Sequence, residues 1–240
     1  MSGYAGLRMA ARALLRIELT PEQQLAFERY SNALIAWNER YNLTAITDPV
    51  NIETKHFLDS MTCLQVMGVP NLARVVDVGT GAGFPGLPLK ILYRQMKLTL
   101  VESIGKKVEF CRHVIKTLDL TGVELIHDRA ENVGHKEGHR QLYDWALARA
   151  VAAMPVLVEY LLPLLRVGGQ AVIQKGETGP AEAHAAEDAL RILGGKLEQI
   201  IPVELPRVVE SRYLIVVQKN AATPLKYPRR VGIPTKRPLG

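Results

Sequence analysis

Cysteine, long apolar runs and a secretory leader are scarce or missing in this sequence of 240 residues. The two cysteines, Cys63 and Cys111, are too few and too isolated for a disulfide framework or a zinc site. No apolar run approaches the ~18 residues of a membrane-spanning helix, and no hydrophobic segment with a cleavage site follows the N-terminus. We therefore expect a cytoplasmic protein that holds no metal and does not cross a membrane.

Acidic residues are absent from the last 30 positions, which carry seven basic side chains. These are Arg212, Lys219, Lys226, Arg229, Arg230, Lys236 and Arg237. The formal net charge is +6, and the remaining 23 basic and 24 acidic residues nearly cancel, so the basicity is a C-terminal feature. Such a segment attracts phosphates or anionic lipid; the alternative is a solvated tail without a specific partner. Its prolines predict that residues 224–240 are extended and not packed.

Positions 75–86 read Val-Val-Asp-Val-Gly-Thr-Gly-Ala-Gly-Phe-Pro-Gly. The first four residues predict a buried strand, the alternate glycines predict a turn, and Pro85 predicts the first turn of a helix. In an open α/β sheet such a corner lies at the carboxyl end of a strand, where ligands bind. Because the residues of the turn are small, we expect a ligand to lie against bare backbone N–H groups.

Strand and helix patterns alternate after this motif. We expect further strands at 97–101, 123–126, 143–148 and 170–175, and helices at 85–94, 106–118, 154–165 (closed by Gly168-Gly169) and 181–193. The last two strands, 197–205 and 212–219, have no helix between them and should pair antiparallel. The alternation predicts an α/β fold with a mostly parallel, twisted sheet and helices on both faces.

The first 70 residues look helical. Thr20-Pro21-Glu22-Gln23 is a capping box, and Asp48-Pro49 begins another helical stretch. Basic residues at helical spacing before them (Arg8, Arg12 and Arg16) fit a transit peptide, although an ordinary N-terminal helix fits better. We expect a helical N-terminal extension at 1–70, a ligand-binding domain at 71–220 and a basic, proline-rich tail at 221–240.

The glycines alone do not identify the ligand. A G-x-G-x-x-G string runs from Gly81 to Gly86, but counted from Gly79 the sixth position is Phe84. An acid, Glu102, ends the next strand 25 residues after Asp77, near the spacing of ~20 residues expected for a ribose-binding carboxylate. This pattern fits S-adenosylmethionine and a nicotinamide cofactor equally, and a turn without a ligand remains the third alternative.

Further segments, in this order, complete a family resemblance. They are Asn42-Leu-Thr-Ala-Ile46, His56-Phe-Leu-Asp-Ser60, Glu102-Ser103 with Lys106-Lys107, Arg129-Ala130-Glu131, Arg149-Ala150-Val151 and Lys175-Gly176. With the glycine turn, which resembles the cofactor loop of Rossmann-like class I methyltransferases, they resemble the GidB (RsmG) family over residues 20–220. That family methylates a guanine of bacterial small-subunit (16S) ribosomal RNA.

The resemblance implies transfer of a methyl group from S-adenosylmethionine to ring nitrogen 7 of guanine. The implied partner is small-subunit ribosomal RNA, free or in a ribosomal subunit or assembly intermediate. The matched cofactor positions are Gly79, Phe84, Ala130, Glu131 and Arg149, together with Asp77, Gly81 and Gly83 of the turn; Glu102 is assigned to the ribose by spacing. The substrate candidates are His56, Arg129, Lys175, Arg212, Arg229 and Arg230, for each of which an ordinary structural or surface role is the alternative.

The implied reaction needs no general base, because ring nitrogen 7 already carries a lone pair. We therefore assign no catalytic side chain. The Asn/Asp-Pro-Pro-aromatic motif of exocyclic-amine methylation is absent, and both cysteines read as helical core residues rather than nucleophiles. The rival functions are a nicotinamide-dependent oxidoreductase and a non-catalytic RNA-binding module on the same fold.

Overall fold

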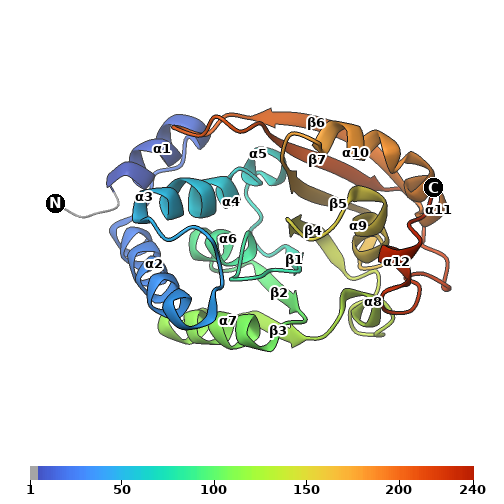
Figure 1. Cartoon of the computed structure of the whole chain (residues 1–240), viewed down its shortest axis with the longest axis horizontal. Helices are drawn as coiled ribbons and strands as arrows, with labels where there is room; N and C mark the ends of the chain where they lie inside the picture. Colours follow the sequence, from blue (N-terminus) through green and yellow to red (C-terminus); the bar gives the residue numbers. More distant parts are fainter. Residues whose placement is uncertain (1–4) are drawn as a thin grey trace.

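A seven-stranded sheet forms the frame of the computed structural model, which describes residues 5–240 (Figure 1). The strands are β1 (Arg74–Val78), β2 (Lys97–Glu102), β3 (Val123–His127), β4 (Tyr143–Arg149), β5 (Leu165–Lys175), β6 (Gly195–Val203) and β7 (Arg212–Lys219). They lie in the order β3-β2-β1-β4-β5-β7-β6. Neighbours from β3 to β5 are parallel, and β7 is antiparallel to both β5 and β6. The predicted mostly parallel sheet and the predicted antiparallel final pair are confirmed.

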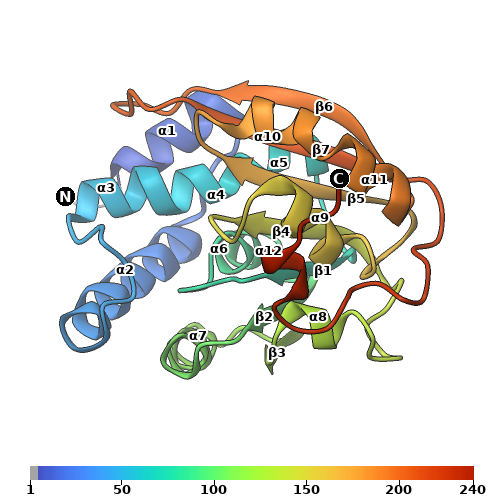
Figure 2. The same ribbon diagram turned by 45° about the vertical axis from the view of Figure 1, so that its right-hand side comes forward.

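Helices cover both faces of the sheet (Figure 2). Successive strand residues point to opposite faces, so Val75 of β1 joins one hydrophobic cluster and Val76 joins the other. On the first face lie α1 (Ala5–Leu15), α2 (Pro21–Tyr41), α3 (Pro49–Ile52), the π-helical segment η1 (Glu53–Leu58), α4 (Asp59–Met61), α5 (Leu64–Met67), α6 (Gly86–Leu92) and α7 (Gly105–Thr117). On the second lie α8 (Ala130–Val133), α9 (Met154–Leu161), α10 (Gly179–Ala185), α11 (Glu187–Leu193) and α12 (Ile233–Lys236). The predicted α/β class is confirmed.

The N-terminal helices share a hydrophobic cluster with the sheet. Leu7 of α1 and Phe27 of α2 are buried in the same cluster as Val75 and Leu98 of the strands. The expected boundary near residue 70 falls in the loop between α5 and β1, and the first four residues of the expected extension lie outside the described part. Within residues 5–240, no helix is long and apolar enough to cross a membrane.

Two helix predictions were wrong in extent. The helix expected over 154–165 ends at Leu161, and Gly168-Gly169 lie inside β5 rather than at a helix end. A Cβ at Gly169 would stand 2.9 Å from the carbonyl oxygen of Asp144, so glycine there allows β5 to approach β4. The helix expected over 181–193 is divided at Ala186 into α10 and α11.

The prediction of an extended, unpacked tail was also wrong. Residues 224–240 include the short helix α12, and Tyr227 is only 7% exposed. The segment passes beside α8 and α9 in both views (Figures 1 and 2). The proline content predicts an extended segment because proline disfavours regular structure. Tertiary contacts determine the conformation of this segment instead.

Tyr30 connects α2 to the glycine turn. Its ring is fully buried and stacks on Phe84, with centroids 5.4 Å apart. Its hydroxyl donates a hydrogen bond to the carbonyl oxygen of Ala82 in the middle of the turn. Burial raises the pKa of Tyr30 well above its ordinary value, so the hydroxyl remains a donor at all physiological pH values. The N-terminal helices therefore support the ligand-binding corner directly.

We expect Tyr30→Phe to lower the free energy of unfolding by about 1–2 kcal/mol, because it leaves a buried carbonyl without its donor. Urea unfolding followed by circular dichroism measures this loss. Tyr41→Phe is the matched control, since Tyr41 is 41% exposed and its substitution should change the unfolding free energy little. Equal effects of the two substitutions would contradict a supporting role for the Tyr30 hydroxyl.

Candidate functional site

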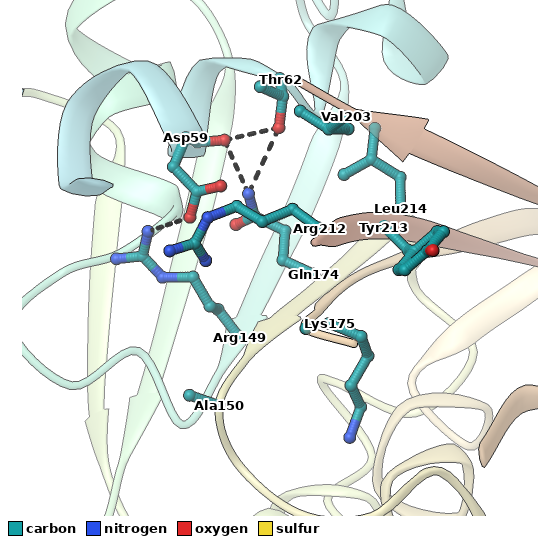
Figure 3. Close-up of a pocket in the computed structure, with 11 residues that line it drawn as sticks. Asp59, Thr62, Arg149, Ala150, Gln174, Lys175, Val203, Arg212, Tyr213 and Leu214 are labelled. Carbon is teal, nitrogen blue, oxygen red and sulfur yellow. Dashed lines mark hydrogen bonds and ion pairs between the residues drawn. The ribbon is translucent and has the colours of Figure 1, made fainter. Parts of the chain in front are cut away.

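Two neighbouring cavities lie at the carboxyl ends of the parallel strands. The first, here the acidic cavity, encloses about 370 Å³ that is partly open to solvent. It is lined by Val78, Gly79, Val101, Glu102, Ser103, Asp128, Arg129, Ala130, Glu131, Val151 and Tyr160. The second, here the arginine cavity, encloses about 470 Å³ and is shown in Figure 3. It is lined by Asp59, Thr62, Arg149, Ala150, Gln174, Lys175, Gly176, Val203, Arg212, Tyr213 and Leu214. Consecutive residues, Ala150 and Val151, line one cavity each.

The turn after β1 requires glycine. Gly79 and Gly83 have positive φ angles of 67° and 93°, a region that other residues adopt at a cost. A Cβ at Gly79 would stand 2.7 Å from the Val151 side chain, and one at Gly83 would overlap Leu87. Gly79 also lines the acidic cavity, and its contact with the cofactor remains a prediction.

Within residues 5–240, all but one of the backbone N–H groups of this turn have acceptors in the protein, the exception being that of Ala82. Gly79 and Thr80 donate to the carbonyl of Val101, and Gly83 and Phe84 donate to the carbonyl of Thr80. Gly81 donates to the carboxylate of Glu102 at 2.9 Å. Most of the N–H groups that we expected to face a ligand are therefore used within the protein, and the single N–H group left, that of Ala82, is fewer than the phosphate cradle of a dinucleotide needs.

Glu102 fixes the turn from the end of β2. Its Oε2 accepts the hydrogen bond from Gly81, and its Oε1 accepts from the N–H groups of Ser103 and Ile104, both at 2.8 Å. A carboxylate offers about four acceptor positions, so one remains toward the cavity. The predicted bond to a ribose hydroxyl remains a prediction; the structural role was not visible in the sequence.

Asp77 lies beneath the turn and lines neither cavity. Its Oδ2 accepts hydrogen bonds from the Thr80 hydroxyl at 2.6 Å and from the Gly86 N–H at 2.8 Å, whereas its Oδ1 has no hydrogen-bond partner in the described part of the chain. Burial raises its pKa to about 6. Asp77 therefore joins the two ends of the turn, and direct contact with the cofactor remains a prediction.

The segment after β3 forms the opposite wall of the acidic cavity. Ala130 and Glu131 begin α8 and are both buried. The carboxylate of Asp128 accepts hydrogen bonds from the side chains of Lys136 and Asn132. These bonds, together with one from the backbone N–H of Arg129, lower the pKa of Asp128 to about 2. Arg129, predicted to contact substrate, lines this cavity beside the predicted cofactor residues, and its contact with substrate remains a prediction.

Arg149 is the central cation of the arginine cavity. It donates to the carboxylate of Asp59 at 2.8 Å, and Asp59 is only 3% exposed (Figure 3). It also contacts Nδ1 of His56 at 3.4 Å and lies over the Phe84 ring, 5.0 Å from the centroid. The sequence did not single out Asp59, although its spacing of three from His56 places both on one side of a helix.

His56 is held as a neutral ring. It stacks on Phe84 with centroids 4.5 Å apart, and its Nε2 lies 3.0 Å from the Thr44 hydroxyl. Burial, reinforced by the charge of Arg149, lowers its pKa to about 3. Because Arg149 donates to Nδ1, Nε2 carries the proton. His56 belongs to η1, and π-helical turns often occur at functional sites.

The other predicted substrate residues differ in availability. Arg212 lines the arginine cavity, and within residues 5–240 its guanidinium makes no hydrogen bond or ion pair. The Lys175 ammonium instead donates to Glu182 at 2.7 Å and to the Ala152 carbonyl at 2.6 Å. Arg229 is paired with Glu159, and Arg230 is exposed.

Gln174 is a site residue that the sequence did not reveal. Its Nε2 donates to the Asp59 carbonyl at 2.6 Å, while its Oε1 is buried beside the arginine cavity and has no hydrogen-bond partner among residues 5–240. No composition or spacing signal marks a single glutamine in a strand. Among the described residues, no group of three or more His, Cys, Asp and Glu side chains is arranged to hold a metal.

The strand order, the glycine turn after β1 and the acid after β2 define a Rossmann-like class I methyltransferase. A solved S-adenosylmethionine-dependent methyltransferase from Aquifex aeolicus has the same fold, with a TM-score of 0.53, 17% identity and coverage of 71% of this chain and 93% of that one.

The family model described as "rRNA small subunit methyltransferase G" (GidB) matches residues 23–209. Ribosomal RNA small subunit methyltransferase G of Desulforamulus reducens is 46% identical over 97% of both chains. That of Roseiflexus castenholzii is 49% identical over 97% of this chain and 98% of its own. The protein belongs to the GidB family. It is an S-adenosylmethionine-dependent methyltransferase, and the nicotinamide alternative is set aside.

We expect the buried Asp77 to make stability depend on pH. Its folded pKa of about 6 lies above the ordinary value of 3.8, so the folded state favours the protonated form. Relative to Asp77→Asn, the wild-type protein should therefore lose roughly 3 kcal/mol of unfolding free energy as the pH rises from about 4 to about 6. Chemical unfolding of both proteins without cofactor measures the difference; a difference that is constant over this range would contradict the assignment.

Proposed function

We propose that the protein transfers a methyl group from S-adenosylmethionine to ring nitrogen 7 of a guanine in small-subunit (16S) ribosomal RNA. The observation that carries this proposal is the pairing of an acidic cavity at the glycine turn with an adjoining cavity that holds an unpaired arginine. We place the reaction in the cytoplasm, where small-subunit ribosomal RNA is assembled.

The acidic cavity suits the adenosine part of S-adenosylmethionine. Its apolar walls, Val101, Ala130 and Val151, can pack against the base, and the carboxylates of Glu102 and Glu131 can accept hydrogen bonds from hydroxyl and amine groups. The cosubstrate carries an electrophilic methyl group on a sulfonium centre. Arg149 lines the arginine cavity and lies over the Phe84 ring; both residues are matched to cofactor positions in the family and would guide the methyl-bearing end.

The arginine cavity suits the target nucleotide. Asp59 balances the charge of Arg149, whereas the guanidinium of Arg212 forms no hydrogen bond or ion pair among the described residues, and the nearby acid Glu210 pairs with Lys55 instead. A guanidinium in this position can donate to the guanine carbonyl oxygen, which is adjacent to ring nitrogen 7, or to a phosphate. Lys175 is less suited to this role because Glu182 already pairs with it.

No proton needs to leave guanine before ring nitrogen 7 attacks. His56 contacts both Phe84 and Arg149, and its neutral ring accepts from Arg149 and donates to Thr44, so it orients neighbours and removes no proton. Catalysis then depends on holding two reactants in line, which can supply about 7–11 kcal/mol of the barrier reduction.

Arg212→Gln should reduce kcat/KM for RNA by roughly 10- to 100-fold, the loss of one charge-assisted hydrogen bond. Cofactor affinity and the free energy of unfolding should change little, because the Arg212 guanidinium makes no hydrogen bond or ion pair within residues 5–240. Labelled methyl transfer to ribosomal RNA from cells lacking the protein measures this effect, and cleavage at 7-methylguanine maps the product. Arg191→Gln, on the exposed face of α11, is the matched control.

Wild-type kinetics for Arg212→Gln would remove Arg212 from the substrate contacts. A methylated product that resists cleavage at 7-methylguanine would overturn the proposed ring position. The absence of any transfer by the wild-type protein would favour a non-catalytic RNA-binding role.

A further inference from the structure

The C-terminal segment, residues 221–240, lies against the same part of the protein that forms the acidic cavity. It leaves the end of β7, passes beside α8 and α9, and includes α12, coloured red in Figures 1 and 2. Its basic composition alone indicates an arm for RNA. Its contacts indicate a different role.

A buried carboxylate anchors the segment. Glu159 of α9 is completely buried, and its Oε2 lies 2.6 Å from Nη2 of Arg229, whose Nε and backbone N–H also donate to this carboxylate. A buried carboxylate needs such a partner. Arg230, the next residue in the chain, is exposed, so the two adjacent arginines have different roles.

Carbonyl groups of the segment are held as well. Arg140 donates to the carbonyls of Thr223 and Tyr227 at 2.9 and 2.8 Å. His135 contacts the carbonyl of Pro228 at 2.6 Å. A Cβ at Gly134 would stand 2.7 Å from the Pro228 ring, so the surface beneath the segment is shaped to receive it.

Two residues that line the acidic cavity are held by the segment. The N–H of Gly232 donates to Oε1 of Glu131 at 3.0 Å, and the Thr235 hydroxyl lies 3.2 Å from the Tyr160 hydroxyl. Glu131 and Tyr160 both line the cavity. Glu131 is 5% exposed with the segment in place, and its carboxylate shares the cavity with those of Glu102 and Asp128.

We propose that residues 229–235 position the wall of the cofactor cavity, with Arg229 as the anchor and Gly232 and Thr235 as the positioning residues. The inference rests on the proposed assignment of the acidic cavity to adenosine. Without the Gly232 N–H, the Glu131 carboxylate would turn toward water and away from the other acids. Binding would then have to order that wall, which weakens affinity even though no residue that touches the ligand has changed.

Two truncations separate this role from an RNA arm. A chain that ends at Arg229 keeps the anchor and loses Gly232 and Thr235; a chain that ends at Lys236 keeps all three and is the matched control. Binding is measured by calorimetric titration with S-adenosylhomocysteine, without RNA. The shorter chain should bind about tenfold more weakly at both 50 and 300 mM salt, because tenfold corresponds to roughly the loss of one hydrogen-bonded contact. The longer truncated chain should bind within about twofold of the full-length protein.

Point variants keep the test valid should the shorter chain fold poorly, as thermal unfolding would show. Thr235→Val should weaken S-adenosylhomocysteine binding by about threefold, whereas Thr117→Val, at an exposed position on α7, should leave it unchanged. Normal ligand affinity in the shorter chain and in Thr235→Val would overturn the proposal. If such a chain also showed a smaller salt dependence of RNA binding, the segment would be an RNA arm instead.

Ser103→Trp distinguishes failure of this inference from failure of the cavity assignment. Ser103 is half-buried at the edge of the acidic cavity, and an indole there should block S-adenosylhomocysteine binding. Normal binding by Ser103→Trp would move the adenosine site elsewhere and overturn both proposals. Blocked binding by Ser103→Trp together with normal binding by the truncated chains would overturn the positioning role alone.

Discussion

The buried ion pair between Arg149 and Asp59 is the interaction on which both sides of the site depend. Asp59 comes from the N-terminal helices and Arg149 from the end of β4, so the pair joins the helical layer to the sheet at the wall of the arginine cavity, one residue before Ala150 and two before Val151 of the acidic cavity. Removing one member of such a pair leaves a buried charge, at a cost of about 3–5 kcal/mol. Loss of activity on removing Arg149 would therefore report folding as much as methyl transfer.

Carboxylates organise the rest of the corner by accepting hydrogen bonds from the backbone. Glu102 holds the middle of the glycine turn, Asp77 joins its two ends, and Glu131 holds the C-terminal segment. In each case a side chain that spacing or resemblance assigns to a ligand also fixes a loop. A preorganised wall of this kind keeps the ordering cost of binding small.

The sequence predicts the fold well because the relevant signals are local. Val75 to Val78 are β-branched apart from one aspartate, the strands are separated by helical periods, and alternate glycines permit only a turn. The side-chain roles that the sequence does not predict depend on partners that are distant in the chain. Arg229 and Arg230 are identical in type and adjacent, yet only Arg229 faces Glu159, 70 residues away. Likewise, Lys175 has the charge expected of a substrate contact, but its ammonium is paired with Glu182. Gly168-Gly169 resemble a helix end, although the glycine at 169 allows two strands to approach closely.

The hydrogen bonds of the glycine turn explain why a glycine-rich corner can favour a nucleoside over a dinucleotide. In dinucleotide-binding folds the pyrophosphate takes the free N–H groups at the start of the helix. Here Gly79, Thr80, Gly81, Gly83 and Phe84 all donate within the protein, and the carboxylates of Glu102 and Asp128 would repel a phosphate. Among residues 5–240, the guanidinium groups of Arg129 in the acidic cavity and of Arg212 in the arginine cavity both lack a hydrogen bond or ion pair. Under the proposed function, the carboxylates beside the glycine turn favour a donor without phosphate in the acidic cavity, and the nucleotide of the RNA would enter the arginine cavity.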